Sequence, residues 1–419
     1  MPEVSRIAAA TVAAVSEGAS LNDALPPALA SHGLSAGQRA AIQDAVYGTL
    51  RWQVRLDTML DRLLTQPGTA SALRALLQVG LYRLFYGRLP AHTVVNLLVE
   101  AAPPSRKGFV NAVLRNALRQ RAELEVAADA GLGSRLSYPA WWVETLTTAW
   151  GDAAEPAMAA GNTHPPFTLR VNARRIAVAD YLAWLDDAGI PARHLGGEAV
   201  LLPTPMAVDA LPGFIDGLVS VQDWAAQWSA DLLDLRPGLR VLDACAAPGG
   251  KAAHIAERSD VDLLAVELDE KRLHRARDTF NRLGVTVPTR CADVAQTDTW
   301  WDGRSFDRIL ADLPCSGSGV VRRHPDIKRL RRHEDIEGFA AQQRRILDAL
   351  WPLLAPGGRL LMVTCSIFPG ENRLQAQSFA ERHADAVVVA LDHPALVEGQ
   401  ALPSADHDGF FYAAFDKRR

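Results

Sequence analysis

Two cysteines of this chain lie in short turns of small residues, each of which follows an apolar, strand-like run. Cys315 lies in the turn Asp312-Leu313-Pro314-Cys315-Ser316-Gly317-Ser318-Gly319, and Cys365 lies in the turn Thr364-Cys365-Ser366. A lone cysteine is usually a core residue. Two cysteines at the ends of neighbouring parallel strands instead meet at one edge of the sheet, where ligands bind. The pattern predicts a pair of reactive thiols beside the Asp312 carboxylate.

Such a pair suits the methylation of cytosine at ring carbon 5. Cytosine C5 is a weak carbon nucleophile, but addition of a thiolate at C6 makes an enamine whose C5 attacks a sulfonium methyl group. An acid such as Asp312 stabilises the charge that develops at N3 and the exocyclic amine. The C5 proton must then leave and the thiol must be eliminated. This sequence of steps gives a task to a second group beside the ring.

A candidate cofactor site precedes these turns. The strand-like Val241-Leu242 leads into the turn Gly249-Gly250 and a helix that begins near Lys251. Glycine permits close backbone approach, and a helix N-terminus presents free N–H groups to a ligand. Glu267 ends the next strand, where a nucleotide site places a carboxylate on ribose hydroxyls, and Asp293 follows the third strand, within reach of an adenine amino group.

Other nucleotide chemistries are disfavoured by the same segment. The chain has no G-x-x-x-x-G-K-[ST] loop, which argues against a nucleoside triphosphatase. It has no G-x-G-x-x-G after the first strand, which argues against a dinucleotide oxidoreductase. An adenosyl cofactor without phosphate fits better.

The elements that must position these residues form a doubly wound sheet. From about Arg236, the apolar runs 241–242, 263–266, 309–311 and 360–363 alternate with amphipathic helical segments. This alternation is typical of buried parallel strands with helices on both faces. Residues 131–235, interrupted by several prolines, are interpreted as a small α+β domain. We therefore expect domains at 1–130, 131–235 and 236–419.

The first domain is expected to be helical and basic. Ser35 and Gln38 form a capping box ahead of Ile42, Val46, Leu50 and Val54, which repeat every four residues. Residues 33–121 contain twelve Lys and Arg but four Asp and Glu, and the apolar stripe in 110–118 leaves arginines on the outer face. A solvated basic face is one interpretation, and RNA binding is the more specific one.

Composition restricts the class of protein. The chain has 419 residues, 48% hydrophobic and 22% charged, which predicts a globular protein of two or three domains. The four cysteines include no C-x-x-C pair, so neither a disulfide framework nor a metal site is expected. No apolar stretch near the start is long enough to span a bilayer, and no leader pattern occurs there. We expect a cytoplasmic protein that has no membrane partner and requires no oligomer.

The motifs carry a family resemblance. Asp243-Ala244-Cys245-Ala246-Ala247-Pro248-Gly249-Gly250-Lys251, Asp312-Leu313-Pro314-Cys315-Ser316-Gly317 and Thr364-Cys365-Ser366, with Glu371-Asn372 behind, resemble those of the NOL1/NOP2/Sun family of RNA cytosine-C5 methyltransferases. The basic segment 107–115 resembles the NusB-like extension of the bacterial Sun/Fmu members, which modify small-subunit rRNA. The resemblance implies an all-α NusB-like domain, a small α+β domain and a Rossmann-like class I S-adenosylmethionine-dependent methyltransferase domain.

The resemblance also implies roles for single residues. Cys365 resembles the attacking nucleophile, Cys315 the cysteine that assists product release, Asp312 the acid that contacts cytosine, and Lys251 a residue that holds the catalytic network. The implied contacts of S-adenosylmethionine are Cys245, Ala246, Ala247, Pro248, Gly249, Gly250, Lys251, Glu267, Asp293 and Asp312. Glu267 stands where Asp is common in the family. Cys291 matches no catalytic motif and is interpreted as a packing residue.

The expected partner is RNA, most specifically 16S rRNA. A basic run, Arg322-Arg323-His324 with Lys328-Arg329 and Arg331-Arg332-His333, is predicted to contact phosphates at the mouth of the site. Reaching C5 and C6 requires a single-stranded or flipped cytosine. The alternatives are a tRNA substrate, an RNA-binding protein with a degenerate catalytic domain, and a methyltransferase acting on an exocyclic nitrogen. The last would carry a polar-Pro-Pro-aromatic turn where this chain has Asp312-Leu313-Pro314-Cys315.

Overall fold

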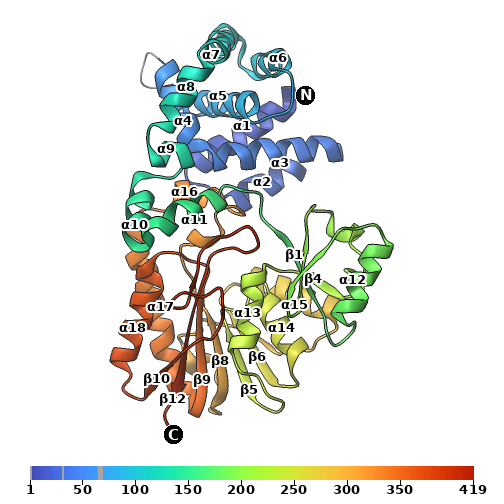
Figure 1. Ribbon diagram of the computed structural model, residues 1–419, viewed down its shortest axis with the longest axis vertical. Coiled ribbons are helices and arrows are strands. Elements are labelled where there is room, and N and C mark those ends of the chain that lie inside the picture. The colour runs from blue at the N-terminus through green and yellow to red at the C-terminus, as the bar shows by residue number, and fades with distance from the viewer. Residues whose placement is uncertain (1, 31–32, 65–68) are drawn as a thin grey trace. The chain divides into compact units, whose positions relative to one another are not determined.

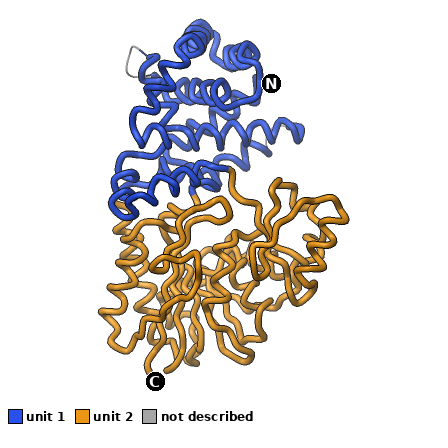
Figure 2. Tube along the Cα trace, viewed as in Figure 1, with its two compact units in different colours: residues 1–163, 321–333 blue, residues 164–320, 334–419 orange. Residues whose placement is uncertain are grey.

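The computed structural model describes residues 2–30, 33–64 and 69–419. These residues form two compact units, coloured separately in Figure 2. The helical unit comprises residues 1–163 and 321–333, and the α/β unit comprises residues 164–320 and 334–419. Within the described ranges, no helix combines the length and the apolar character needed to cross a bilayer.

The helical unit is a bundle packed around its fifth helix. Its α-helices are α1 (Pro2–Ser16), α2 (Leu21–Ala30), α3 (Ala36–Arg51), α4 (Gln53–Leu63), α5 (Ser71–Phe85), α6 (Ala91–Ala101), α7 (Lys107–Arg119), α8 (Arg121–Asp129), α9 (Leu132–Leu136), α10 (Ala140–Trp150), α11 (Ala154–Ala160) and α16 (Ile327–Leu330). Helix α5 is buried continuously from Ala75 to Leu84, and α1, α3, α6 and α7 contact it. A Cβ atom on Gly80 would lie 2.8 Å from Leu114, so this glycine allows α5 and α7 to approach closely.

The sequence predicted the start of α3 and the outer face of α7. Ser35 and Gln38 form the predicted capping box. The four-residue repeat does not continue to Val54, because α3 ends at Arg51 and Val54 lies in α4 with part of its surface exposed. In α7 the residues Val110, Val113 and Leu114 are buried, whereas the neighbouring arginines of this helix are exposed, as predicted.

The α/β unit begins with a small antiparallel sheet. The strands β1 (Phe167–Val171), β2 (Arg193–Gly196), β3 (Ala199–Leu202) and β4 (Val219–Val221) pair in the order β2-β3-β1-β4. Helix α12 (Val178–Asp187) packs against them, and Tyr181 and Leu185 of this helix share a core with strand residues. Figure 1 shows α12 beside β1 and β4, and this α+β subdomain has a hydrophobic core of its own.

The rest of the α/β unit is the predicted doubly wound sheet. It consists of α13 (Trp224–Leu232), β5 (Arg240–Ala244), α14 (Gly250–Arg258), β6 (Asp262–Glu267), α15 (Glu270–Leu283), β7 (Thr289–Cys291), β8 (Phe306–Asp312), α17 (Asp335–Leu350), β9 (Leu354–Thr364), α18 (Arg373–Arg382), β10 (Ala386–Val389), β11 (Gln400–Ala401) and β12 (Phe410–Lys417). The strand order is β10-β12-β9-β8-β5-β6-β7, with β11 paired to β12.

The pairing of the central strands explains where ligands can bind. Strand β5 pairs in parallel with β6 and β8, and β8 pairs in parallel with β9, so their carboxyl ends share one edge. Residues of α13, α14 and α15 pack into the core on one face, whereas α17 and α18 pack on the other (Figure 1). The four predicted strands are therefore confirmed. The antiparallel strands β10 and β12 extend the sheet beyond them.

Candidate active site

The two cysteines at the ends of β8 and β9 face each other. The Sγ atoms of Cys315 and Cys365 lie 3.5 Å apart. The backbone holds the two turns together, because the N–H of Leu313 donates to the carbonyl of Val363 and the N–H of Gly319 donates to the carbonyl of Cys365, each at 2.9 Å. One ligand at this edge can therefore meet both sulfur atoms.

The surroundings of the two thiols differ. A hydrogen bond with Cys365 and burial raise the pKa of Cys315 well above its usual range, and the Glu371 carboxylate adds to that rise. On the other side, the charges of Cys365 and Lys251 attract each other and contribute to the raised pKa of Lys251. The environment therefore favours a protonated Cys315 and a cation near Cys365.

Lys251 and Asp312 form an ion pair next to the thiols. The Nζ atom of Lys251 donates to a carboxylate oxygen of Asp312 at 2.7 Å. Burial lowers the pKa of Lys251, but the attraction of Asp312 outweighs it and leaves this pKa raised. The ammonium also lies 5.4 Å from the centre of the Phe410 ring. Lys251 is thus a cation at neutral pH, held against the carboxylate of the last residue of β8.

The glycine turn after β5 has the backbone shape that the sequence predicted. Gly249 has a φ of +94° and directly precedes α14, which begins at Gly250. A Cβ atom on Gly249 would lie 3.0 Å from Ala276 of α15, so this position allows close approach as well as a left-handed backbone. Cys245 also has a positive φ, +65°, and the Ala247–Pro248 peptide is cis. The N–H of Gly249 donates to the carbonyl of Ala246 at 2.8 Å, which closes the turn.

Glu267 lies beneath this turn at the end of β6, and its side chain is 3% exposed. Its carboxylate accepts hydrogen bonds from the N–H of Ala247 at 3.1 Å and the N–H of Asp269 at 3.2 Å, and Arg272 lies 3.3 Å from it. The carboxylate is therefore joined directly to the glycine turn. This position suits the predicted contact with a ribose.

Asp293 lies after β7, the strand that neighbours β6. It accepts a hydrogen bond from the N–H of Ala295 at 3.0 Å and from Arg345 of α17 at 2.9 Å. The hydrogen bond from Arg345 is the largest cause of its lowered pKa. Asp293 is therefore an ionised acceptor beside the proposed adenosyl site, with Arg345 as its partner.

Two residues near the turn received no role from the sequence. Arg170 of β1 is 1% exposed, donates to the carbonyl of Gly250 at 2.8 Å and binds both carboxylate oxygens of Glu257 at 2.9 Å. Asp243 at the end of β5 is fully buried, and burial, followed by the charge of Asp312, raises its pKa well above the usual range. In the sequence, each of these charged residues stands between two apolar neighbours of a strand, and that was the available signal for both.

The structure corrects the interpretation of two cations in the basic run. Residues 321–333 belong to the helical unit, in which Arg322 is 1% and Lys328 3% exposed. The Nζ atom of Lys328 donates to the carbonyls of Arg51 and Ser137, both at 2.9 Å, and to the side-chain oxygen of Asn162 at 2.7 Å. Lys328 therefore points into the helical unit and Arg322 is buried, whereas Arg329 and Arg332 of the same run are exposed.

Cys291 is also placed differently from the prediction. Its side chain is exposed at the end of β7, and its thiol donates to the carbonyl of Leu268 at 3.4 Å. The interpretation as a packing residue is therefore wrong. Strand β7 has three residues, and none of them is buried. A cysteine in this strand therefore does not reach a core.

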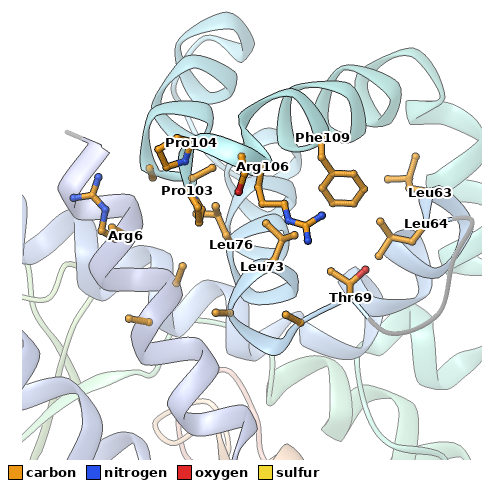
Figure 3. A pocket seen from close by; sticks show the side chains of 17 residues that line it. Arg6, Leu63, Leu64, Thr69, Leu73, Leu76, Pro103, Pro104, Arg106 and Phe109 are labelled. Carbon is orange, nitrogen blue, oxygen red and sulfur yellow. The ribbon is translucent and has the colours of Figure 1, made fainter.

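The helical unit contains a cavity of about 970 Å³. Its wall is largely apolar, with Leu63, Leu73, Leu76 and Phe109, and it includes the guanidinium of Arg106 (Figure 3). None of the residues predicted for catalysis or for cofactor binding lines this cavity. It is therefore separate from the paired cysteines.

Three family models match different parts of this chain. The family described as 16S rRNA methyltransferase RsmB/F matches residues 230–416, a ferredoxin-like domain of RsmF/B-like methyltransferases matches residues 138–209, and the NusB family matches residues 4–119. The crystal structure of PH0851 covers 100% of this chain and 99% of its own, with a TM-score of 0.81 at 24% identity. That likeness confirms the fold.

Curated relatives extend over the whole chain. A ribosomal RNA small subunit methyltransferase B from Pseudomonas putida is 44% identical, covering 98% of this chain and 98% of its own. A protein of the same name from Vibrio cholerae is 42% identical, covering 98% and 96%. The methyl donor is S-adenosylmethionine, as the motifs predicted. With this identity over nearly its full length, the chain belongs to the ribosomal RNA small subunit methyltransferase B family.

Proposed function

We propose that this protein transfers a methyl group from S-adenosylmethionine to C5 of a cytosine in 16S rRNA, through a covalent bond between Cys365 and C6. The observation that carries the proposal is the pair of thiols 3.5 Å apart beside the Lys251–Asp312 ion pair. One thiol can add to C6, and the second can assist the elimination that releases the product. The choice of 16S rRNA rests on the description of the matching family, and the names of the relatives point to small-subunit ribosomal RNA.

The cofactor site is proposed at the turn 245–251. The left-handed Gly249 lets the turn pack closely against α15 at the start of α14, and the buried Glu267 offers a carboxylate for ribose hydroxyls. Asp293 supplies an acceptor for an adenine amino group, and Asp312 an acceptor for the ammonium of the methionine part. When bound there, S-adenosylmethionine supplies an electrophilic methyl group.

Cys365 performs the first step as a thiolate. Its sulfur forms a bond with C6 of the flipped cytosine, and the electron pair of the C5–C6 double bond moves so that C5 becomes nucleophilic. Asp312 accepts a hydrogen bond from the exocyclic amine, and the Lys251 ammonium balances the charge at N3. The raised pKa of Lys251 supports this role, because the cation persists throughout the neutral range.

Cys315 performs the last step. Its hydrogen bond with Cys365 is the largest cause of its raised pKa, and that hydrogen bond weakens once the sulfur of Cys365 is bonded to carbon. Cys315 then releases its proton to water and accepts the proton of C5. The C6–S bond breaks as the ring double bond re-forms, which returns Cys365 as a thiolate.

Covalent trapping tests the roles of the two thiols. Cys365→Ala should bind cofactor and RNA, transfer no methyl group and form no adduct. Cys315→Ala should accumulate a protein–RNA complex that survives denaturing electrophoresis, because elimination is slow. Cys291→Ala is the control and should turn over like the parent protein. An adduct formed by Cys365→Ala and absent from Cys315→Ala would reverse the two roles, and normal turnover by both would eliminate covalent catalysis.

Bisulfite mapping tests the substrate. RNA from cells with and without the protein should differ by an unconverted cytosine in 16S rRNA. A difference found only in tRNA would replace the proposed substrate, and no difference in any RNA would favour an RNA-binding protein without activity.

For the domains, we propose that residues 1–130 and 131–235 bind and place the RNA, whereas residues 236–419 carry the chemistry.

A further inference from the structure

One buried carboxylate is joined to both cysteine turns. Glu371 ends the short helical turn Pro369–Glu371 after β9 and is 0% exposed. Its carboxylate accepts hydrogen bonds from the N–H of Ser316, the hydroxyl of Ser316 and the hydroxyl of Ser366, each at 2.6 Å. Ser316 directly follows Cys315, and Ser366 directly follows Cys365. The same side chain therefore binds the residue next to each thiol.

Further hydrogen bonds close the connection between the turns. The hydroxyls of Ser316 and Ser366 lie 3.3 Å apart, and those of Ser318 and Ser366 lie 2.9 Å apart. The hydroxyl of Ser318 in turn accepts from the N–H of Ile367 at 2.8 Å. All these groups are buried. The sequence contains the signal as a repeated Cys-Ser pair, at 315–316 and 365–366.

A carboxylate suits this position better than an amide would. It offers only acceptor sites, and the groups that face it from Ser316 and Ser366 are donors. A glutamine would turn an NH₂ group toward at least one of them. Burial of the Glu371 carboxylate is costly unless it keeps its hydrogen bonds. Those hydrogen bonds hold the turns of Cys315 and Cys365 in place.

We propose that Glu371 is a positioning residue that sets the separation of the Cys315 and Cys365 sulfur atoms by holding their two turns together. This inference rests on the proposed function in assigning the two thiols to one substrate base. The charge of Glu371 has a second effect, since it contributes to keeping the Cys315 thiol protonated. Glu371 itself does not touch the reacting atoms.

The separation of the thiols can be measured without substrate. In a glutathione redox buffer the two thiols and one glutathione disulfide react to give the Cys315–Cys365 disulfide and two glutathione molecules. The equilibrium constant reports the effective concentration of one thiol at the other. We expect Glu371→Gln to lower this constant at least tenfold. Glu381→Gln, an exposed glutamate of α18, is the matched control and should leave it unchanged.

The assay traps free thiols by alkylation and identifies the peptide that contains the disulfide by mass spectrometry, in a Cys291→Ser background that removes the exposed thiol. Cofactor affinity and circular dichroism establish that each variant is folded. Ser316→Ala and Ser366→Ala each remove one donor to the carboxylate, and each should lower the constant by a smaller factor. If Glu371→Gln does not fold, these two variants decide the outcome.

The turnover of RNA provides a second readout. Glu371→Gln should lower kcat while the affinity for S-adenosylmethionine stays the same, because the carboxylate touches neither the turn 245–251 nor Glu267. A disulfide constant for Glu371→Gln equal to that of Glu381→Gln would overturn the inference, as would equal constants for both serine variants and the parent protein. If Glu371→Gln lowers the disulfide constant but the parent protein itself methylates no RNA, the positioning role is supported and the proposed function is refuted.

Discussion

Cations have opposite surroundings in the α/β unit and on the outer face of α7 in the helical unit. Lys251 is 13% exposed, and its ammonium is held 2.7 Å from Asp312. Arg115 and Arg119 of α7 are exposed, and their hydrogen bonds are to neighbouring asparagines of their own helix. A buried paired charge has one defined position, whereas an exposed one adapts to any phosphate. We therefore expect the Lys251–Asp312 pair to serve chemistry and the exposed arginines of α7 to serve affinity.

Removal of the buried cation should have the largest effect. Lys251→Met leaves the carboxylate of Asp312 without its cation and leaves no charge beside Cys365, so we expect kcat to fall by about 100-fold or more, the usual size of a lost electrostatic contribution. Lys271→Met, at an exposed lysine of α15, is the control. Single-turnover methylation measures both. Equal rates for the two variants would show that the buried pair does not serve chemistry.

The buried histidine of α14 should make stability depend on pH. Burial lowers the pKa of His254 to about 4, although Glu198 opposes the shift. In the unfolded chain it titrates near 6.5. Below that pH the unfolded state binds a proton that the folded state does not, so stability is lost as pH falls from about 6.5 to 4, by roughly 3 kcal/mol in total.

His254→Gln should remove that part of the slope, and His274→Gln, an exposed histidine of α15, should keep it. Urea unfolding at several pH values provides the measurement. Replacement of the exposed arginines of α7 should leave the slope as it is. A slope unchanged in His254→Gln would assign the acid sensitivity to other groups.

Loss of the buried carboxylate beneath the glycine turn should have a moderate effect. Glu267→Ala removes the hydrogen bonds to Ala247 and Asp269 together with the proposed ribose contact. We expect S-adenosylmethionine to bind about 1–3 kcal/mol more weakly, the usual consequence of unpaired partners. Titration calorimetry without RNA tests this, with the exposed Glu337→Ala as control. Unchanged affinity would remove Glu267 from the cofactor site.

Loss of exposed cations should have the smallest effect. Arg115→Gln with Arg119→Gln should weaken RNA binding severalfold and reduce the slope of log affinity against log salt by about 1 to 2, because each phosphate contact contributes about 0.7 to 0.9. The pair Arg236→Gln with Arg304→Gln, exposed in the α/β unit, is the matched control. Deletion of residues 1–130 is a poorer test, since it would expose Lys328 and Arg322. Equal slopes for both pairs would contradict an RNA-binding face on α7.

The sequence by itself determined the fold class and the edge of the sheet at which the site lies. Strand-like runs at 241–242, 263–266, 309–311 and 360–363 alternate with helices, and parallel strands place their carboxyl ends together whatever their side chains are. That rule of backbone geometry was enough to bring Cys315, Asp312 and Cys365 to one edge. The exposed arginines of α7 followed equally from helical periodicity.

Only the tertiary structure decided which charged groups are paired and which are buried. Lys328 and Arg322 stand in a run of cations that is indistinguishable in sequence from a solvated face, yet both are buried. Glu371 stands 55 residues from Ser316, so no local pattern could join them. Such contacts depend on where side chains distant in sequence come together, and the packing of the whole unit sets those positions.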